Sequence, residues 1–379
     1  MDVSKDNSIV MKRHIGVTGE GQKKEEQLPS GNDEPKQVEN GDVRNDGDGE
    51  SQTWFGLLPT KTRNEVPLIF REPHINTGFR QPYQPWYYYL LSVFQIHNES
   101  VNVLTHLIAC LLMFQKVQKF TEAGYDLIGD PYMWPLIAGF IAGFLLYGCS
   151  SFAHCFQSKS EYYHYFCFMV DYSAIGVYGF GCALLHFHYS ADEEFYYAAK
   201  SFFIPVATFM GFFTCFGNMH GKLTYTRPYP FTRKLWQIGS VAAMYAWLIL
   251  PIVHRFFDCR FYQDERHCDR SINAHLRQVF FFLTSGIFYA SDIPQKFFPG
   301  CFDIVGHSHQ IFHVFIALCS LSKLDAIFLD IQDNYQYIIK RPQPTFLSSF
   351  SSLIIIISLE IAWVLYNKQK IMKKAAKEV

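Results

Sequence analysis

The stretch FLSSFSSLIIIISLEIAWVLY, residues 346–366, decides the fold class of this chain. It is apolar apart from small hydroxyl side chains and the single carboxylate of Glu360. A helix needs about 20 predominantly apolar residues to cross the hydrocarbon core of a bilayer, and this stretch has that length. The sequence therefore predicts a membrane-spanning α-helix here.

Seven further segments towards the N-terminus carry long apolar runs of the same kind. With the first stretch, the expected spans lie near residues 100–118, 133–156, 163–187, 196–218, 235–256, 276–297, 305–322 and 346–366. The seventh is short and holds three histidines, so hydropathy favours it least. The predicted fold class is an all-α membrane protein, with a seven-helix core bundle followed by an eighth C-terminal transmembrane helix.

Composition divides the remaining chain. Residues 1–52 are polar, with scarcely any aromatics, and predict a disordered tail. Aromatics, prolines and basic residues mark a juxtamembrane segment, 53–99, with an interfacial helix around 85–97. The divisions that follow are the seven-helix core at 100–322, an extracellular loop at 323–345, the eighth helix at 346–366 and a basic cytoplasmic tail at 367–379.

The charged residues between the spans predict the orientation. Eight spans put both termini on one side, which collects Arg63, Arg71, Arg80, Lys159, Lys222, Arg227, Arg233, Lys234, Lys296 and the lysines of 368–377. The loops on the opposite side are richer in acids, although the loop at 256–274 also carries arginines. Because cytoplasmic loops carry an excess of Lys and Arg, we expect both termini in the cytoplasm.

Charge and cysteine usage narrow the function classes. The formal net charge is -1 and no segment has a concentrated basic stripe, so a nucleic-acid partner is not expected. Most of the 10 cysteines lie in apolar segments, where a thiol behaves as a small hydrophobe. Cys259 and Cys268 share a polar loop and form either a disulfide, if the loop is extracellular, or two free thiols.

Four ionisable residues lie at matched depth inside the predicted spans. His154 ends the second span at the cytoplasmic side, and the third span begins on that side and contains Asp171. His309 and His313 begin the seventh span, four residues apart, so both rings share one helical face. Because ionisable groups inside a bilayer are costly, they mark a functional site.

Three imidazoles and a carboxylate are a plausible set of zinc ligands. His154, His309 and His313 would leave a fourth position for water, as catalytic zinc sites do. Asp171 would either bind the metal directly or hold a metal-bound water. The alternative is that the histidines are helix–helix hydrogen-bond partners with no metal.

Neighbouring polar residues have two readings. Ser150, four residues before His154, would either support the site by orienting its ring or serve only in helix packing. Glu99, Asn102 and His106 share one face where the first span begins. They form either a second polar site or, for Glu99, a carboxylate that suits the positive end of the helix dipole.

Taken together, these motifs resemble the progestin and adipoQ receptor family. The likeness rests on Glu99-xx-Asn102-xxx-His106, Ser150-xxx-His154, Asp171, and Phe298-Pro299-Gly300 leading into Ser308-His309-Gln310-Ile311-Phe312-His313. It covers roughly residues 66–340. The eighth span, with Gln157-Ser158-Lys159-Ser160-Glu161 and Phe187-His188-Tyr189, resembles the membrane progestin receptor branch, near its alpha and beta types.

The resemblance implies a function as well as a fold. It implies zinc near the cytoplasmic face on His154, His309 and His313, with Asp171 contacting zinc-bound water. It further implies a plasma-membrane receptor for a progestin-like steroid or another lipid that signals through inhibitory G proteins. The alternative implied by the adiponectin-receptor branch and by alkaline ceramidases is an intramembrane zinc amidohydrolase acting on a lipid amide.

One motif departs from the family. Its members commonly carry Pro-Glu-Arg before the Phe-Pro-Gly turn, whereas this chain has Pro294-Gln295-Lys296. Gln295 replaces a carboxylate, and Lys296 replaces a guanidinium that can form bidentate hydrogen bonds with a group that carries only a point charge. We expect any ion pair formed there to be weaker.

Overall fold

The structure, a computed structural model, describes residues 56–226, 229–261 and 270–377. The regular secondary structure of these residues is helical, and the described residues contain one isolated β-bridge, between Lys61 and Phe79. The predicted tail at 1–52 and Cys268 lie outside the described residues. The α-helices are α1 (Trp86–Leu91), α2 (Ser100–Glu122), α3 (Trp134–Phe156), α4 (Glu161–Leu185), α5 (Glu193–Ala199), α6 (Phe203–Thr224), α7 (Phe231–Leu248), α8 (Leu250–Phe261), α9 (Ser271–Ser291), α10 (Ser308–Ile338), α11 (Phe346–Tyr366) and α12 (Lys368–Ala375).

Several of these helices are long and apolar enough to cross a membrane. Four meet that test alone, within Ser100–Glu122, Pro131–Lys159, Glu161–Ser190 and Phe346–Tyr366. Two bent pairs, α5 with α6 and α7 with α8, raise the number to six if each pair is one span. The all-α, multi-pass class predicted from the sequence is confirmed, whereas α9 and α10 are not among the helices that pass this test.

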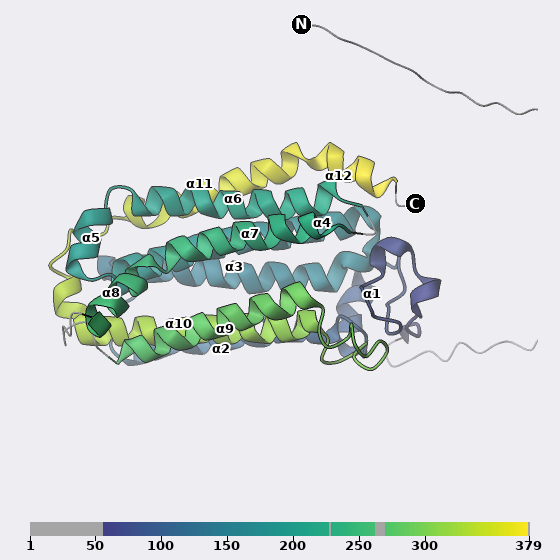
Figure 1. Cartoon of the computed structure of the whole chain (residues 1–379), viewed down its shortest axis with the longest axis horizontal. Helices are drawn as coiled ribbons and strands as arrows, with labels where there is room; N and C mark the ends of the chain where they lie inside the picture. The colour runs from purple at the N-terminus through teal and green to yellow at the C-terminus, as the bar shows by residue number, and fades with distance from the viewer. Residues whose placement is uncertain (1–55, 227–228, 262–269, 378–379) are drawn as a thin grey trace, which may run out of the picture. The chain divides into compact units, whose positions relative to one another are not determined.

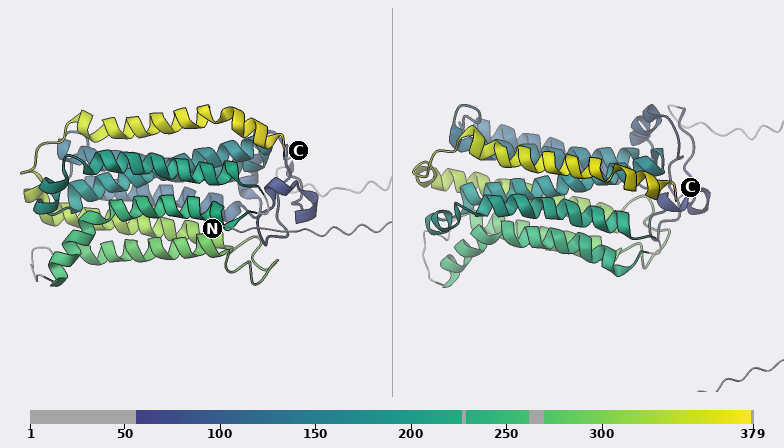
Figure 2. Two further views of the ribbon diagram at one scale, coloured as in Figure 1. Left: turned by 45° about the horizontal axis from the view of Figure 1, so that its top comes forward. Right: turned by 90° about the horizontal axis from the view of Figure 1, so that it is seen from above.

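The long helices lie side by side along one axis (Figures 1 and 2). In Figure 1, α2, α9 and α10 form the lower part of the bundle, α3 and α7 lie in its middle, and α6 and α11 form the upper part. The short helices α1 and α12 lie at one end, and α5 and α8 lie at the other. We call these the α1 end and the α5 end.

The predicted loop at 323–345 is wrong over most of its length. Helix α10 does not stop at Ser322 but continues to Ile338, so only 339–345 connects it to α11. The charged residues that predicted a loop have partners in the bundle: Asp325 pairs with Lys116 at 2.7 Å, and Asp330 pairs with Arg255 at 2.9 Å. Paired charges are tolerated inside a bundle, so the helix need not end there.

Two predicted spans are bent rather than straight. The span expected at 196–218 is formed by α5 and α6, which meet at 73°. The span expected at 235–256 is formed by α7 and α8, which meet at 52°. Pro251 lies at the start of α8, and proline lacks the N–H that would continue the hydrogen bonds of α7.

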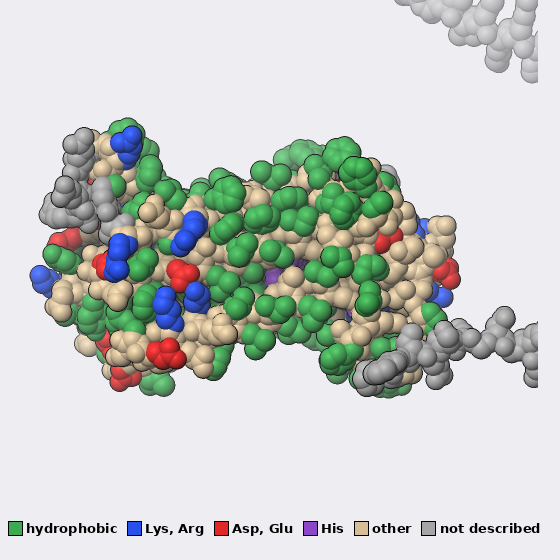
Figure 3. Space-filling model, turned by 90° about the horizontal axis from the view of Figure 1, so that it is seen from below, with side chains coloured by type: hydrophobic (Ala, Val, Ile, Leu, Met, Phe, Trp, Pro, Cys, Tyr) green, Lys and Arg blue, Asp and Glu red, His purple; other side chains and the backbone are tan. Residues whose placement is uncertain are grey.

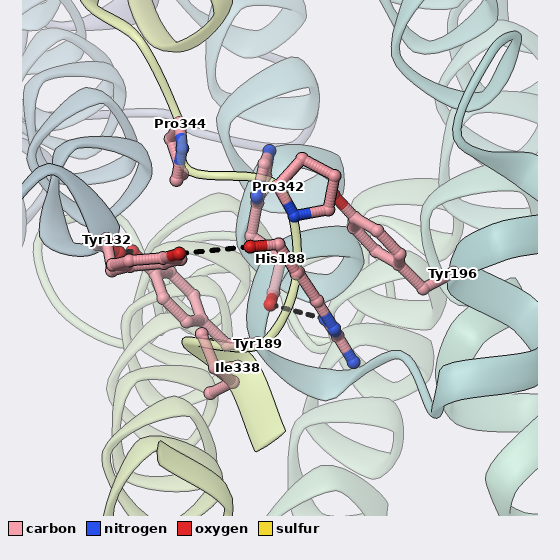
Figure 4. Close-up of a pocket in the computed structure, with 8 residues that line it drawn as sticks. Tyr132, His188, Tyr189, Tyr196, Ile338, Pro342 and Pro344 are labelled. Carbon is pink, nitrogen blue, oxygen red and sulfur yellow. Dashed lines mark hydrogen bonds between the residues drawn. The ribbon is translucent and has the colours of Figure 1, made fainter. Parts of the chain in front are cut away.

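The connection after α10 is tied to the α5 end of the bundle. The guanidinium of Arg341 donates to the carbonyl oxygens of His188 at 2.8 Å and Ala191 at 2.6 Å. The Tyr132 hydroxyl in turn donates to the carbonyl oxygen of Arg341 at 3.0 Å. Figure 4 shows Tyr132, His188 and Pro342 grouped around this connection. The small hollow beside it has a volume of about 10 Å³, which is room for about one water molecule.

The outer surface suits a bilayer. On the face shown in Figure 3, hydrophobic side chains cover the middle, and most charged ones gather towards the α5 end. Exposed apolar residues on α2, α9 and α11 include Leu111 (67%), Leu283 (59%) and Ile354 (56%). Cys259, near the end of α8, is disulfide-bonded, as expected if the α5 end faces an oxidising compartment.

Candidate functional site

Three histidines from two helices meet at the α1 end of the bundle. His154 lies in the last turn of α3, and His309 and His313 lie in the first two turns of α10. One ring nitrogen of each lies within 4.8 Å of the others, and the Nε2 atoms of His154 and His309 are 3.2 Å apart. His154 and His313 are buried and His309 is half-buried. The spacing and depth argument thus selected three residues that the fold brings together.

Glu99 orients the first of these rings. Its Oε2 atom lies 2.7 Å from Nδ1 of His154, which leaves Nε2 directed at the other histidines. The same carboxylate accepts hydrogen bonds from Asn102 and Gln157, each at 2.7 Å. Glu99 is therefore part of this site. A carboxylate on the far nitrogen of a histidine is the usual support for a metal ligand.

His313 is held by α2. Its Nδ1 atom faces the carbonyl oxygen of Asn102 at 3.3 Å and the hydroxyl of Thr105 at 3.4 Å, so Nε2 is available on the other side. The ring of His106 stacks on that of His313, with centroids 3.8 Å apart and planes 7° apart. Neither nitrogen of His106 has a hydrogen-bond partner among the described residues. His106 thus packs beside the cluster rather than joining it.

Asp171 lies near the three histidines but outside their group. Its carboxylate is buried on α4. The Nδ1 atom of His154 faces Glu99 and its Nε2 atom faces His309, and the supporting role of Ser150 stays a prediction. Both Asp171 and Ser150 line the cavity described below. This placement favours a contact through water or a ligand atom over direct coordination.

Gln295, which differs from the residue common in the family, forms hydrogen bonds with the start of α10. Its amide oxygen accepts from the backbone N–H of Ser308 at 2.8 Å, and its amide nitrogen donates to the Ser308 hydroxyl at 2.7 Å. These bonds satisfy the first turn of α10, where backbone N–H groups have no partner within the helix. The predicted loss of an ion pair is thus offset by a neutral cap directly before His309.

A cavity of about 300 Å³ extends from the histidines into the bundle. Asp171, His309 and His313 line one end, and Tyr178, Ser320 and Lys323 line the other. Between them the wall is apolar, formed by Ile175, Val241, Met244, Phe282, Phe312 and Ile316. Pockets of a few hundred Å³ with apolar walls and few polar groups are typical of small-molecule sites.

The cavity reaches the surface between α7 and α9. Ala242 on α7 and Leu283 on α9 line it and are themselves exposed. Farther towards the α5 end, the stacked rings of Tyr245 and Phe282, 3.5 Å apart, bridge the two helices. An apolar molecule dissolved in the bilayer can therefore reach the cavity without crossing the polar ends.

Sequence reasoning missed two parts of this site. Glu99 was interpreted chiefly through the helix dipole, although its spacing from Asn102 already placed both on the face that meets α3. Lys323 was assigned to a loop because hydropathy registers a charge but not its partners. Its signal was its position fourteen residues after His309, which is close to a whole number of helical turns.

Comparison with known proteins places the chain in a family. The model of the haemolysin-III related family matches residues 94–324. The chain is 40% identical over 285 residues to "Membrane progestin receptor beta" of Mus musculus, which covers 75% of this chain and 80% of that protein. It is 41% identical over 282 residues to "Membrane progestin receptor alpha-B" of Danio rerio, covering 74% and 79%.

A human relative gives a similar match. "Membrane progestin receptor alpha" of Homo sapiens is 38% identical over 273 residues, covering 72% of this chain and 77% of that protein. The family model's match, residues 94–324, includes the three histidines and the residues that line the cavity. The chain therefore belongs to the haemolysin-III related family, which is the progestin and adipoQ receptor family, in its membrane progestin receptor branch.

Proposed function

We propose that this protein is a cell-surface receptor for a progestin-like steroid and that the cavity between α4, α7, α9 and α10 is its ligand site. The observation that carries the proposal is the cavity itself, which is apolar along its length and polar at both ends. A steroid has this distribution of polarity, and the relatives named as membrane progestin receptors share the region that builds the cavity.

The proposal includes a topology for this receptor. Seven helical spans form the core, with α9 and α10 among them, and α11 forms the eighth. Both termini lie in the cytoplasm, so the α1 end faces inward at the plasma membrane. The charges of α10 are compatible with this because Lys323 and Asp330 are buried inside the bundle. An inhibitory G protein would then meet the α1 end.

The three-histidine group supports a zinc ion as the cofactor. Its nitrogen donors suit zinc, and Glu99 fixes one ring as bound metals require. When bound, zinc would act as a Lewis acid at this end of the cavity. His154, His309 and His313 would hold the ion, and Asp171 would hold a polar ligand atom or water beside it. By linking α3 to α10, the ion would also brace the cavity wall.

Steroid binding and zinc content test this proposal together. Membranes expressing the wild-type chain should bind a radiolabelled progestin saturably, and the purified protein should contain about one zinc ion. The double variant His309→Ala/His313→Ala should lose the zinc, because one remaining histidine cannot hold it. His220→Ala, on the half-exposed part of α6, is the matched control. A wild-type chain that binds no progestin would reject the receptor function.

A second candidate is a zinc-dependent amidohydrolase acting on a lipid amide. The observation in its favour is Asp171, a buried carboxylate beside the histidines that faces the same cavity. A carboxylate there would serve as general base by taking a proton from water. Asp171→Asn would then lower ceramide hydrolysis by about 100-fold or more while zinc content stays unchanged. Wild-type protein without measurable turnover, on a preparation that binds the progestin, would reject this candidate.

A further inference from the structure

The far end of the cavity holds a buried lysine that the zinc site does not explain. Lys323 lies on α10, is 4% exposed and lines the cavity at the end opposite the histidines. Among the described residues, no carboxylate forms an ion pair with it. An ammonium group inside a bilayer is costly and marks a functional position. Its neighbours show what it is arranged to bind.

The hydrogen bonds of Lys323 leave one donor over. Its Nζ atom donates to the Tyr178 hydroxyl at 3.1 Å and contacts the Cys182 thiol. The Tyr178 hydroxyl donates in turn to Ser320, which donates to the carbonyl oxygen of Ile316 at 3.0 Å. An ammonium has three N–H donors, and two are used. The third has no protein acceptor among the described residues.

We propose that Lys323, supported by Tyr178, is a binding site for a carbonyl oxygen at the end of the ligand that lies farther from the histidines. This inference rests on the proposed steroid-receptor function and adds the orientation of the ligand. His313 and Lys323 are ten residues apart on one helix, which corresponds to about 15 Å along the axis. A progestin is a rigid molecule with a ketone at each end, so one ketone reaches Lys323 while the other stays at the histidine end.

The arrangement explains why this end of the cavity is charged. A ketone is a neutral acceptor, and a hydrogen bond from a charged donor to it is stronger than one from a hydroxyl. The wall between the two ends is apolar, so a ligand without an acceptor at this point would leave the ammonium with an unused donor. An unpaired donor in a buried site costs binding free energy. The site therefore discriminates against analogues that lack this oxygen more strongly than a purely apolar pocket would.

Three ligands and one substitution test the site. The ligands are a progestin with ketones at C3 and C20 and two analogues that each lack one of these oxygens. Lys323→Met should weaken binding of the diketone by about 10-fold to 100-fold. It should leave binding of one of the two analogues unchanged, because that analogue lacks the oxygen that Lys323 contacts. Lys116→Met, a partly exposed lysine on α2, should change none of the three affinities.

Each outcome decides the proposal. A variant that binds all three ligands as the wild type does, or that loses affinity equally for all three, rejects the carbonyl site while leaving the receptor function intact. Wild-type protein that binds none of the ligands rejects both. Lys323→Gln keeps an N–H donor without the charge and should give a smaller loss with the same preference among ligands. If neither variant folds, Lys323 is structural and the proposal fails.

Discussion

Two of the buried polar clusters on helix α10, one around Asp330 and one around His309 and His313, are built in opposite ways. Towards the α5 end, the fully buried carboxylate of Asp330 accepts from Arg255 and His275, each at 2.9 Å, and from the hydroxyls of Ser190 and Ser271. Four side chains there donate to one carboxylate. At the α1 end, three histidines instead direct ring nitrogens at one another beside an open cavity.

This difference separates a structural network from a ligand site. A buried polar network whose members are all satisfied rigidifies a protein and needs nothing further. The Nε2 atoms of His154 and His309 are 3.2 Å apart, and such a pair is joined either by the N–H of one ring or by a cation that both rings bind. The Asp330 network, in which one carboxylate accepts from four side chains, is closed, whereas the histidine cluster supports the proposal of a bound ion.

The largest effect is expected from opening the closed network. Asp330→Asn removes the charge that compensates buried Arg255 and should lower the free energy of unfolding by about 3 kcal/mol or more. Asp325→Asn is the control, because its pair with Lys116 is partly exposed and should contribute less than about 1 kcal/mol. Thermal unfolding in detergent measures both. Equal stability of the two variants would contradict a structural role for Asp330.

An intermediate effect is expected from weakening the support of the open site. Glu99→Gln removes the negative charge next to His154 while keeping a hydrogen-bond acceptor. Zinc affinity should fall by about 10-fold to 100-fold, the usual result of altering a partner of a metal ligand. Competition with a zinc chelator gives the affinity, and Glu122→Gln at the exposed end of α2 is the control. Unchanged zinc affinity would show that Glu99 only caps the helix.

The smallest effect is expected at the neighbour of the open site. His106→Phe keeps an aromatic ring on His313 and removes two nitrogens that have no described partner. Zinc content should stay the same, and stability should not fall. His106→Ala removes the stack and should cost about 1 kcal/mol. Loss of zinc in His106→Phe would show that His106 is itself a zinc ligand and belongs to the cluster.

The sequence predicted the histidine cluster more accurately than the helix that carries it. An i, i+4 pair and a topological depth are properties of short segments, so His309, His313 and His154 could be related without knowing any contact. The end of α10 could not be predicted in this way, because it depends on whether Asp325 and Asp330 have partners on α2 and α8. The role of Glu99 was hidden for the same reason. Its partner lies on α3, more than fifty residues away.

The bends also escaped prediction. Hydropathy reports that an apolar segment exists but not the direction it takes, and α5 with α6 and α7 with α8 were read as straight spans. Pro251 gave a local signal for the second bend. Pro205, the third residue of α6, gave a comparable signal for the first bend, between Ala199 and Phe203.

The network around Asp330 also limits how this protein can respond to a ligand. A shift of α10 by one residue, about 1.5 Å along its axis, would pull the carboxylate out of hydrogen-bonding range of Arg255 and His275. Helices α8, α9 and α10 are therefore held together at the α5 end, and a sliding movement of α10 would break these bonds. If the cavity binds a ligand as proposed, we expect the α1 ends of these helices to pivot about the α5 end instead.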